Sequence, residues 1–228
     1  MISKVNKNNR IYLLSIIGCL QFFFLTATAM FFYKGGTYIN TSPLGYLFWQ
    51  NYFSDLGRTV AHSGISNTIS FLLFTITLSL WGITQIPFYI IFPTFFKNYP
   101  ILRKISIGSS ILGIISSISY VGIALTPSDI TGSLHDLFVA ISFSFSFISI
   151  ILYSIVLFKN DSYPNFYAIV LTISAFILSL YFLILFFTPN DQSPEGLLIY
   201  VVGQKFMIYT LLISNIIQSY GALKQNSS

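Results

Sequence analysis

The polar residues best suited to chemistry form two short groups that lie just outside long apolar segments. They are carboxylates, imidazoles and polar neighbours, namely Asn51, Ser54, Asp55, Gly57, Arg58 and His62 in the first group and Asp129, His135 and Asp136 in the second. Carboxylates and imidazoles are good zinc ligands, and a catalytic zinc site uses three protein ligands and a water. The chain has only two histidines. They predict a divalent-metal site with His62 and His135 as ligands and one of Asp55, Asp129 or Asp136 as the third, with Asp55 as the first choice.

A structural polar network is the alternative interpretation of the same residues. Polar groups at the edge of a membrane must find partners for folding reasons alone. In this interpretation Asp55 caps a helix and pairs with Arg58 or Lys205. The spacing of the two histidines matches no HExxH pattern, which favours the network.

Lys205 belongs with these groups because of its depth in the last apolar segment. It follows Gly196 by nine residues, about 13 Å along a helix, and a lysine at that depth is costly unless it is paired. The natural counter-ions are Asp55, Asp129 and Asp136.

Composition shows what must position these residues. The chain is 54% hydrophobic and only 7% charged, whereas soluble domains are about one quarter charged. A net charge of +5 would indicate nucleic acid in a soluble protein, but here the cations flank apolar segments. We therefore expect membrane lipids as partners and no nucleic acid. The single cysteine, Cys19, lies inside an apolar segment and is interpreted as a core residue.

Six segments have the roughly 20 apolar residues that a membrane-spanning helix needs. They cover approximately residues 11–32, 67–92, 105–125, 137–158, 166–188 and 196–220. The sequence thus predicts one all-α integral membrane domain over residues 1–228, a polytopic bundle of six helices. A secretory signal is the weaker interpretation of the first segment, because its apolar run is too long.

The basic residues predict the orientation of the bundle. Eight of the eleven cations would lie on one side: Lys4, Lys7, Arg10, Lys97, Arg103, Lys104, Lys159 and Lys224. The positive-inside rule assigns that side, with both termini, to the cytoplasm of a multi-pass cell-membrane protein. The opposite side receives both histidines and every acid except Asp161, including Asp191.

The connection of residues 33–66 is the longest, and it falls on the outer side. Its centre, Leu44 to Phe53, is rich in Trp, Tyr and Phe. Because Trp and Tyr favour the membrane interface, we expect this segment to lie along that interface and to cover the outer ends of the helices.

The run from Asn51 to Gly57, followed by Asn67 and Phe71, resembles the NxxSDLG signature of a prokaryotic group of six-helix membrane proteins, domain of unknown function 998. The stretch from Gly122 to Pro127, followed by Asp129 and His135, is similar to the second signature of that group. The group is itself similar in layout to the Frag, DRAM and Sfk membrane proteins, so the resemblance implies a role connected with lipids. The ceramidase-like hydrolases are a further comparison, but they hold zinc with three histidines and an aspartate, and this chain has two histidines.

Three functions remain open at this point. The leading hypothesis is that an outer cluster binds a lipid headgroup or small ligand, and its members are Asp55, Arg58, His62, Asp129, His135, Asp136 and Lys205. The second is a metal-dependent lipid hydrolase at the same place. The third is a proton- or ion-coupled carrier with Asp136 and Lys205 as a relay. A purely structural membrane protein also fits the sequence.

Overall fold

The computed structural model describes residues 7–42, 44–188 and 192–227, so the predicted positions of Lys4 and Asp191 lie outside the described residues. The elements are helices joined by short connections and one long loop. In chain order they are α1 (Lys7–Phe32), η1 (Ser54–Gly57), α2 (Thr68–Ile91), η2 (Phe92–Phe96), α3 (Pro100–Leu125), α4 (Ser128–Phe158), α5 (Asn165–Phe187) and α6 (Pro194–Ser227).

Six helices in the described part of the chain are long and apolar enough to cross a membrane, which confirms the all-α class and the predicted number. Several helices extend beyond the apolar segments. Helix α3 starts at Pro100 rather than at residue 105, and α4 starts at Ser128 rather than at residue 137. Proline at the first helical position favours such a start, whereas apolar content marks only the part inside the membrane.

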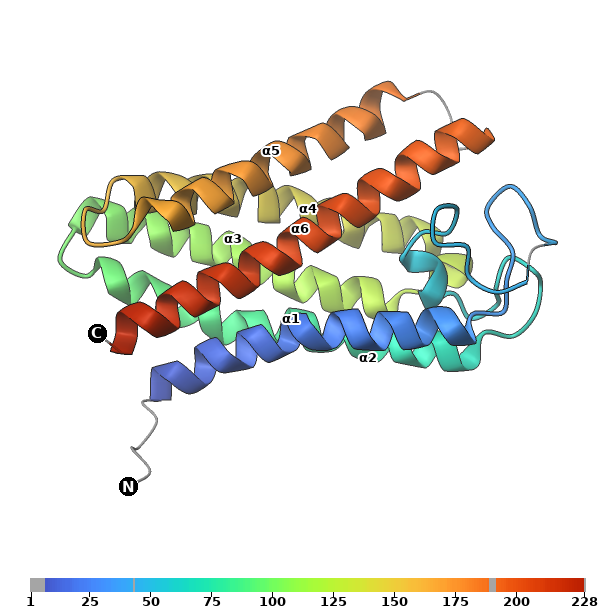
Figure 1. The fold of residues 1–228 in the computed structure, drawn as a ribbon, viewed down its shortest axis with the longest axis horizontal. Coiled ribbons are helices and arrows are strands. Elements are labelled where there is room, and N and C mark those ends of the chain that lie inside the picture. Colours follow the sequence, from blue (N-terminus) through green and yellow to red (C-terminus); the bar gives the residue numbers. More distant parts are fainter. Residues whose placement is uncertain (1–6, 43, 189–191, 228) are drawn as a thin grey trace.

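The six helices form a closed ring. Each packs against its neighbours in sequence, and α6 also packs against α1. Both termini lie at one end of the bundle, and the loop of residues 33–66 lies at the other (Figure 1). Ser15 of α1 joins both adjacent helices, because its hydroxyl bonds to Gln85 of α2 and to Ser219 of α6, each at 2.7 Å.

Serines bring α3 and α4 close together. Ser109 and Ser149 each donate to the other's carbonyl oxygen, at 2.8 and 2.9 Å. Ser116 donates to the carbonyl oxygen of Ser142 at 2.8 Å. Small residues let helix backbones approach in a membrane, and the hydroxyls satisfy one another across the contact.

Candidate functional site

Asp55 is the centre of a hydrogen-bonded network inside the long loop. Its Oδ2 accepts from the side-chain amide of Asn51 and from the backbone N–H of Tyr52, both at 2.9 Å. Its Oδ1 pairs with Nε2 of His62 at 3.0 Å, and the two side chains are only 7% and 12% exposed. The predicted partner Arg58 instead donates from Nε to the carbonyl of Val60. Both carboxylate oxygens are therefore engaged in holding the loop together.

Two asparagines and a glycine explain why the loop folds this way. The Asn51 amide also donates to the carbonyl of Gly36 at 2.8 Å, and the Asn67 amide donates to the carbonyl of Arg58 at 3.0 Å. Gly36 has φ +80°, and a Cβ there would lie 2.5 Å from the backbone nitrogen of Ser63. Only glycine fits that position without strain.

Asp129 ties the loop to the start of α4. Its carboxylate accepts from the backbone N–H groups of Thr59 and Val60 and, at 2.6 Å, from the Thr59 hydroxyl. Asp129 is thus on the predicted side of the bundle, but it binds backbone of the same chain. It does not contact His62 or His135 in the described network.

Lys205 ties the loop to α6, and its partners differ from the predicted ones. It is 3% exposed, and its ammonium donates to the carbonyl of Asn51. The rings of Tyr46, Phe48 and Phe53 surround Nζ at 5.0 to 5.4 Å from their centroids. Aromatic faces are electron-rich and stabilise a cation at this distance. Among the described residues the only ion pair is that of His62 and Asp55, so the predicted salt bridge of Lys205 is not formed.

The remaining predicted residues lie apart on α4. Nδ1 of buried His135 bonds to the carbonyl of Thr126 at 2.6 Å, and Asp136 is exposed. No group of three His, Cys, Asp or Glu in the described residues is placed to hold a metal ion. The structure therefore does not assemble the metal site predicted from His62, His135 and Asp55. Nor does it bring Asp136 and Lys205 together as a relay.

Burial keeps the loop tyrosines neutral. Desolvation raises the pKa of Tyr46 well above its ordinary value, and the nearby charge of Asp55 raises it further. The Tyr46 hydroxyl donates to the carbonyls of Asn51 and Tyr52 at 2.9 and 3.0 Å. It can therefore serve as a hydrogen-bond donor throughout the neutral range.

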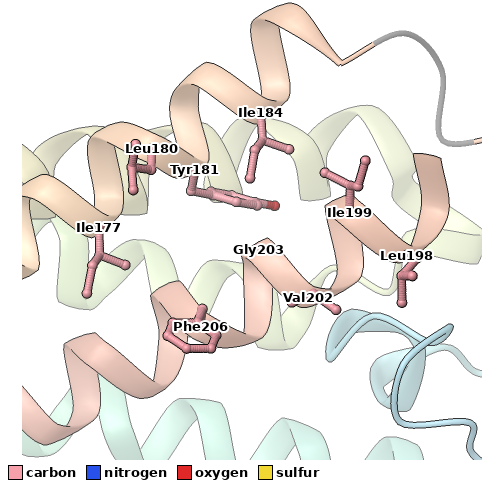
Figure 2. Close-up of a pocket in the computed structure, with 9 residues that line it drawn as sticks. All are labelled: Ile177, Leu180, Tyr181, Ile184, Leu198, Ile199, Val202, Gly203 and Phe206. Atoms are coloured by element: carbon pink, nitrogen blue, oxygen red, sulfur yellow. The ribbon is translucent and has the colours of Figure 1, made fainter. Parts of the chain in front are cut away.

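A wholly apolar groove lies between α5 and α6 on the outside of the bundle. Its volume is about 520 Å³, within the usual range of small-molecule sites. Figure 2 shows Tyr181 and Ile184 of α5 and Ile199 of α6 extending into the space between the two helices. Gly203 makes room for these side chains, because a Cβ there would lie 3.0 Å from Ile184 Cδ1 and 3.1 Å from Tyr181 Cδ2. Ile199 and Phe206 are 44% and 66% exposed, so the groove opens on the face that would meet lipid.

A second hollow lies at the end of the bundle that carries the long loop. It has a volume of about 430 Å³ and shares one lining residue, Leu198, with the groove. Four of its described lining residues are apolar (Ile39, Pro194, Leu197 and Leu198), the other four are Asn40, Trp49, Gln50 and Glu195, and none of the described lining residues is a lysine or arginine. We call Asn40, Trp49, Gln50 and Glu195 the mouth. Trp49 is 59% exposed there.

Sequence reasoning missed both the groove and the mouth. A signal was present in Gly203 and Gln204, which together with Lys205 interrupt the apolar run of residues 197–209. Gln204 proves to be a second link to the loop, since its Oε1 accepts from the backbone N–H of Phe53 at 2.9 Å.

No family model, curated protein or solved structure matches the chain. The resemblance to the domain of unknown function 998 group stays a prediction. Function must therefore be argued from the groove, the mouth and the loop that joins them.

Proposed function

We propose that this protein is a multi-pass protein of the cell membrane that binds one membrane lipid at its outer face. One acyl chain occupies the groove between α5 and α6, and the headgroup occupies the mouth. The observation that carries the proposal is that a wholly apolar groove and a hollow partly lined by polar residues share the lining residue Leu198. An amphiphile has the same sequence of surfaces, apolar and then polar.

The distribution of cations supports the orientation. Six basic residues fall at the end of the bundle that holds the termini: Arg10, Lys97, Arg103, Lys104, Lys159 and Lys224. The positive-inside rule places that end, with both termini, in the cytoplasm. The mouth then faces the outer leaflet, and the exposed Trp49 lies at the depth where tryptophan is favoured.

The headgroup must provide the selectivity, because a chain gains little by leaving other chains that are equally apolar. The mouth offers the Glu195 carboxylate, the amides of Asn40 and Gln50, and the Trp49 ring. Such a lining accepts hydrogen bonds and favours a cation, so it fits a headgroup that bears an ammonium or several hydroxyls. A headgroup that is only an anion finds no basic partner among these residues.

The cluster predicted from sequence acquires a positioning role in this proposal. Asp55 and His62 brace the loop internally, Asp129 fixes it to α4, and Lys205 fixes it to α6. Asn51, which follows Gln50 of the mouth, is held in place by its bond to Lys205. The mouth therefore depends on residues that do not touch the lipid.

Filling the groove tests the proposal. Ile199→Trp places a large ring inside the groove, whereas Ile173→Trp places the same ring at a site on α5 that is 54% exposed and does not line the groove. Lipid bound per mole of detergent-purified protein is measured by native mass spectrometry. We expect near-stoichiometric lipid in the wild type and in Ile173→Trp, and a loss of about tenfold in Ile199→Trp. Equal retention in a folded Ile199→Trp sample would refute the proposal.

A second variant separates the two headgroup chemistries. Glu195→Gln removes the charge and keeps the shape, and a hydrogen bond to a charged group is worth about 1.5–3 kcal/mol. An ammonium headgroup should lose about tenfold in affinity, whereas a sugar headgroup should change little. The probes are nanodiscs with phosphatidylethanolamine, a glycosyl diacylglycerol or phosphatidylglycerol. Preference for phosphatidylglycerol in the wild type would contradict the assigned headgroup chemistry.

A further inference from the structure

A small cavity is enclosed beneath the long loop, where η1 meets the helices. Its volume is about 30 Å³, and its walls come from η1 and from α1, α2, α3, α4 and α6. Most of the wall is aromatic or aliphatic. Ser54 of η1, His135 of α4 and Gln204 of α6 also line it, and among its aromatic residues Trp81 and Tyr120 carry an N–H and a hydroxyl.

The geometry of His135 fixes which ring nitrogen is available to the cavity. Nδ1 lies 2.6 Å from the carbonyl oxygen of Thr126. A carbonyl oxygen only accepts, so Nδ1 carries the hydrogen, and the tautomer of the neutral ring that fits this bond has its acceptor at Nε2. No described residue bonds to Nε2. The imidazole is 4% exposed.

The other two polar side chains also have unused capacity. Gln204 uses Oε1 to accept from the N–H of Phe53, and its amide nitrogen has no partner among the described residues. The Ser54 hydroxyl likewise has none. One acceptor, one amide donor and one hydroxyl thus border the same enclosed space. Buried polar groups are nearly always hydrogen-bonded in native structures, so a missing partner is expected here.

We infer that this cavity binds water, with Nε2 of His135 accepting a hydrogen bond from it and Ser54 and Gln204 completing the site. A cavity needs about 10–15 Å³ to hold one water and the water needs two to four polar partners. The volume of about 30 Å³ therefore accommodates about two molecules. A cavity of this size lined only by apolar groups would stay dry.

The cavity lies on the loop side of the bundle. Toward the middle, the stacked rings of Trp81 and Tyr120, 4.3 Å apart, border the cavity and also a second hollow of about 10 Å³. Toward the termini, the core contains buried aromatic side chains such as Tyr12, Phe92 and Phe96. The cavity is thus separated from the terminal end of the bundle by packed aromatic side chains.

The two histidines of the chain make the test direct. The protein is labelled with ¹⁵N-histidine in nanodiscs, the His135 signals are assigned by comparison with His62→Gln, and magnetisation transfer from water to the His135 ring is measured. We expect transfer, with Nδ1 protonated and Nε2 unprotonated. Absence of transfer in folded protein, or a ring protonated only at Nε2, would overturn the inference.

A variant with a matched control makes the test specific to this site. Ser54→Ala removes one partner of the water. Ser133→Ala changes an exposed serine on α4, two residues before His135. Magnetisation transfer from water to the His135 ring should fall at least several-fold in Ser54→Ala and stay unchanged in Ser133→Ala. If the Ser54→Ala protein proves unstable, Gln204→Met with the same readout replaces it, and full transfer in that variant would also refute the site.

Discussion

The link between Asp129 and the long loop gives a prediction whose magnitude follows from the structure. Three groups donate to the Asp129 carboxylate: the backbone N–H groups of Thr59 and Val60 and the Thr59 hydroxyl. Asp129→Ala removes this acceptor, and no other side chain among the described residues accepts from the two N–H groups. Hydrogen bonds to a charged group are worth about 1.5–3 kcal/mol each when no water replaces them. Val60 is 42% exposed, so water takes over part of the loss. We expect a total destabilisation of about 2–4 kcal/mol.

The hydroxyl contribution can be isolated within that total. Thr59→Val keeps the side-chain shape and should cost about 1 kcal/mol. Unfolding free energies of the two single variants and the double variant are measured by titration with SDS, and cleavage of the loop by protease is followed in parallel. Because the two groups are in contact, the double-mutant cycle should show a coupling of about 1 kcal/mol. A stability of Asp129→Ala within about 0.5 kcal/mol of the wild type, or a fully additive cycle, would refute the reasoning.

Three further predictions concern the same loop. Gly36→Ala should destabilise the protein by more than Gly45→Ala. Both glycines have positive φ, but only at Gly36 would an added Cβ lie 2.5 Å from a backbone atom. Melting temperatures in detergent compare the two variants. Lys205→Met should fold with a stability close to the wild type, because it removes a buried charge and keeps the apolar stem of the side chain. Lys205→Glu should fail to fold, because its carboxylate would face a carbonyl oxygen and three aromatic ring faces. Monodispersity on gel filtration distinguishes the two variants. Burial raises the pKa of Tyr46 in the folded protein, so its contribution to stability is complete below about pH 10 and is lost as the pH rises above that value. Protease cleavage of the loop should therefore increase at alkaline pH, and less so in Tyr46→Phe.

The helices were predictable because their signal is local. Apolar length alone predicted six spans, whereas the side of the membrane predicted from the loop cations stays a prediction. Charge pairing across the fold was less predictable. Lys205 was expected to need a carboxylate at its depth, but a backbone carbonyl and three aromatic rings satisfy the ammonium instead. Sequence shows that a buried charge requires compensation, and only the tertiary structure shows which chemical group provides it.

Sequence likewise predicted only some of the contacts within the cluster of candidate site residues. Asp55 and His62 are seven residues apart in one loop, and the structure brings them together at 3.0 Å. Neither contacts His135, which lies on another element and faces an enclosed cavity. The groove was out of reach for a related reason. Its lining comes from one face of α5 and one face of α6, and apolar content does not reveal the rotation of a helix about its axis.

The bonds between the long loop and α6 have a consequence for synthesis. Phe53 binds Gln204 across 151 residues, and Asn51 binds Lys205 across 154. At a translation rate of about 5–20 residues per second, the loop emerges roughly 8–30 s before its partners on the last helix. During that interval Asn51 and Phe53 are without their partners on α6. The loop end of the bundle is therefore completed last, and a chain released before α6 would carry five helices and a loop held by its own bonds and by Asp129 of α4.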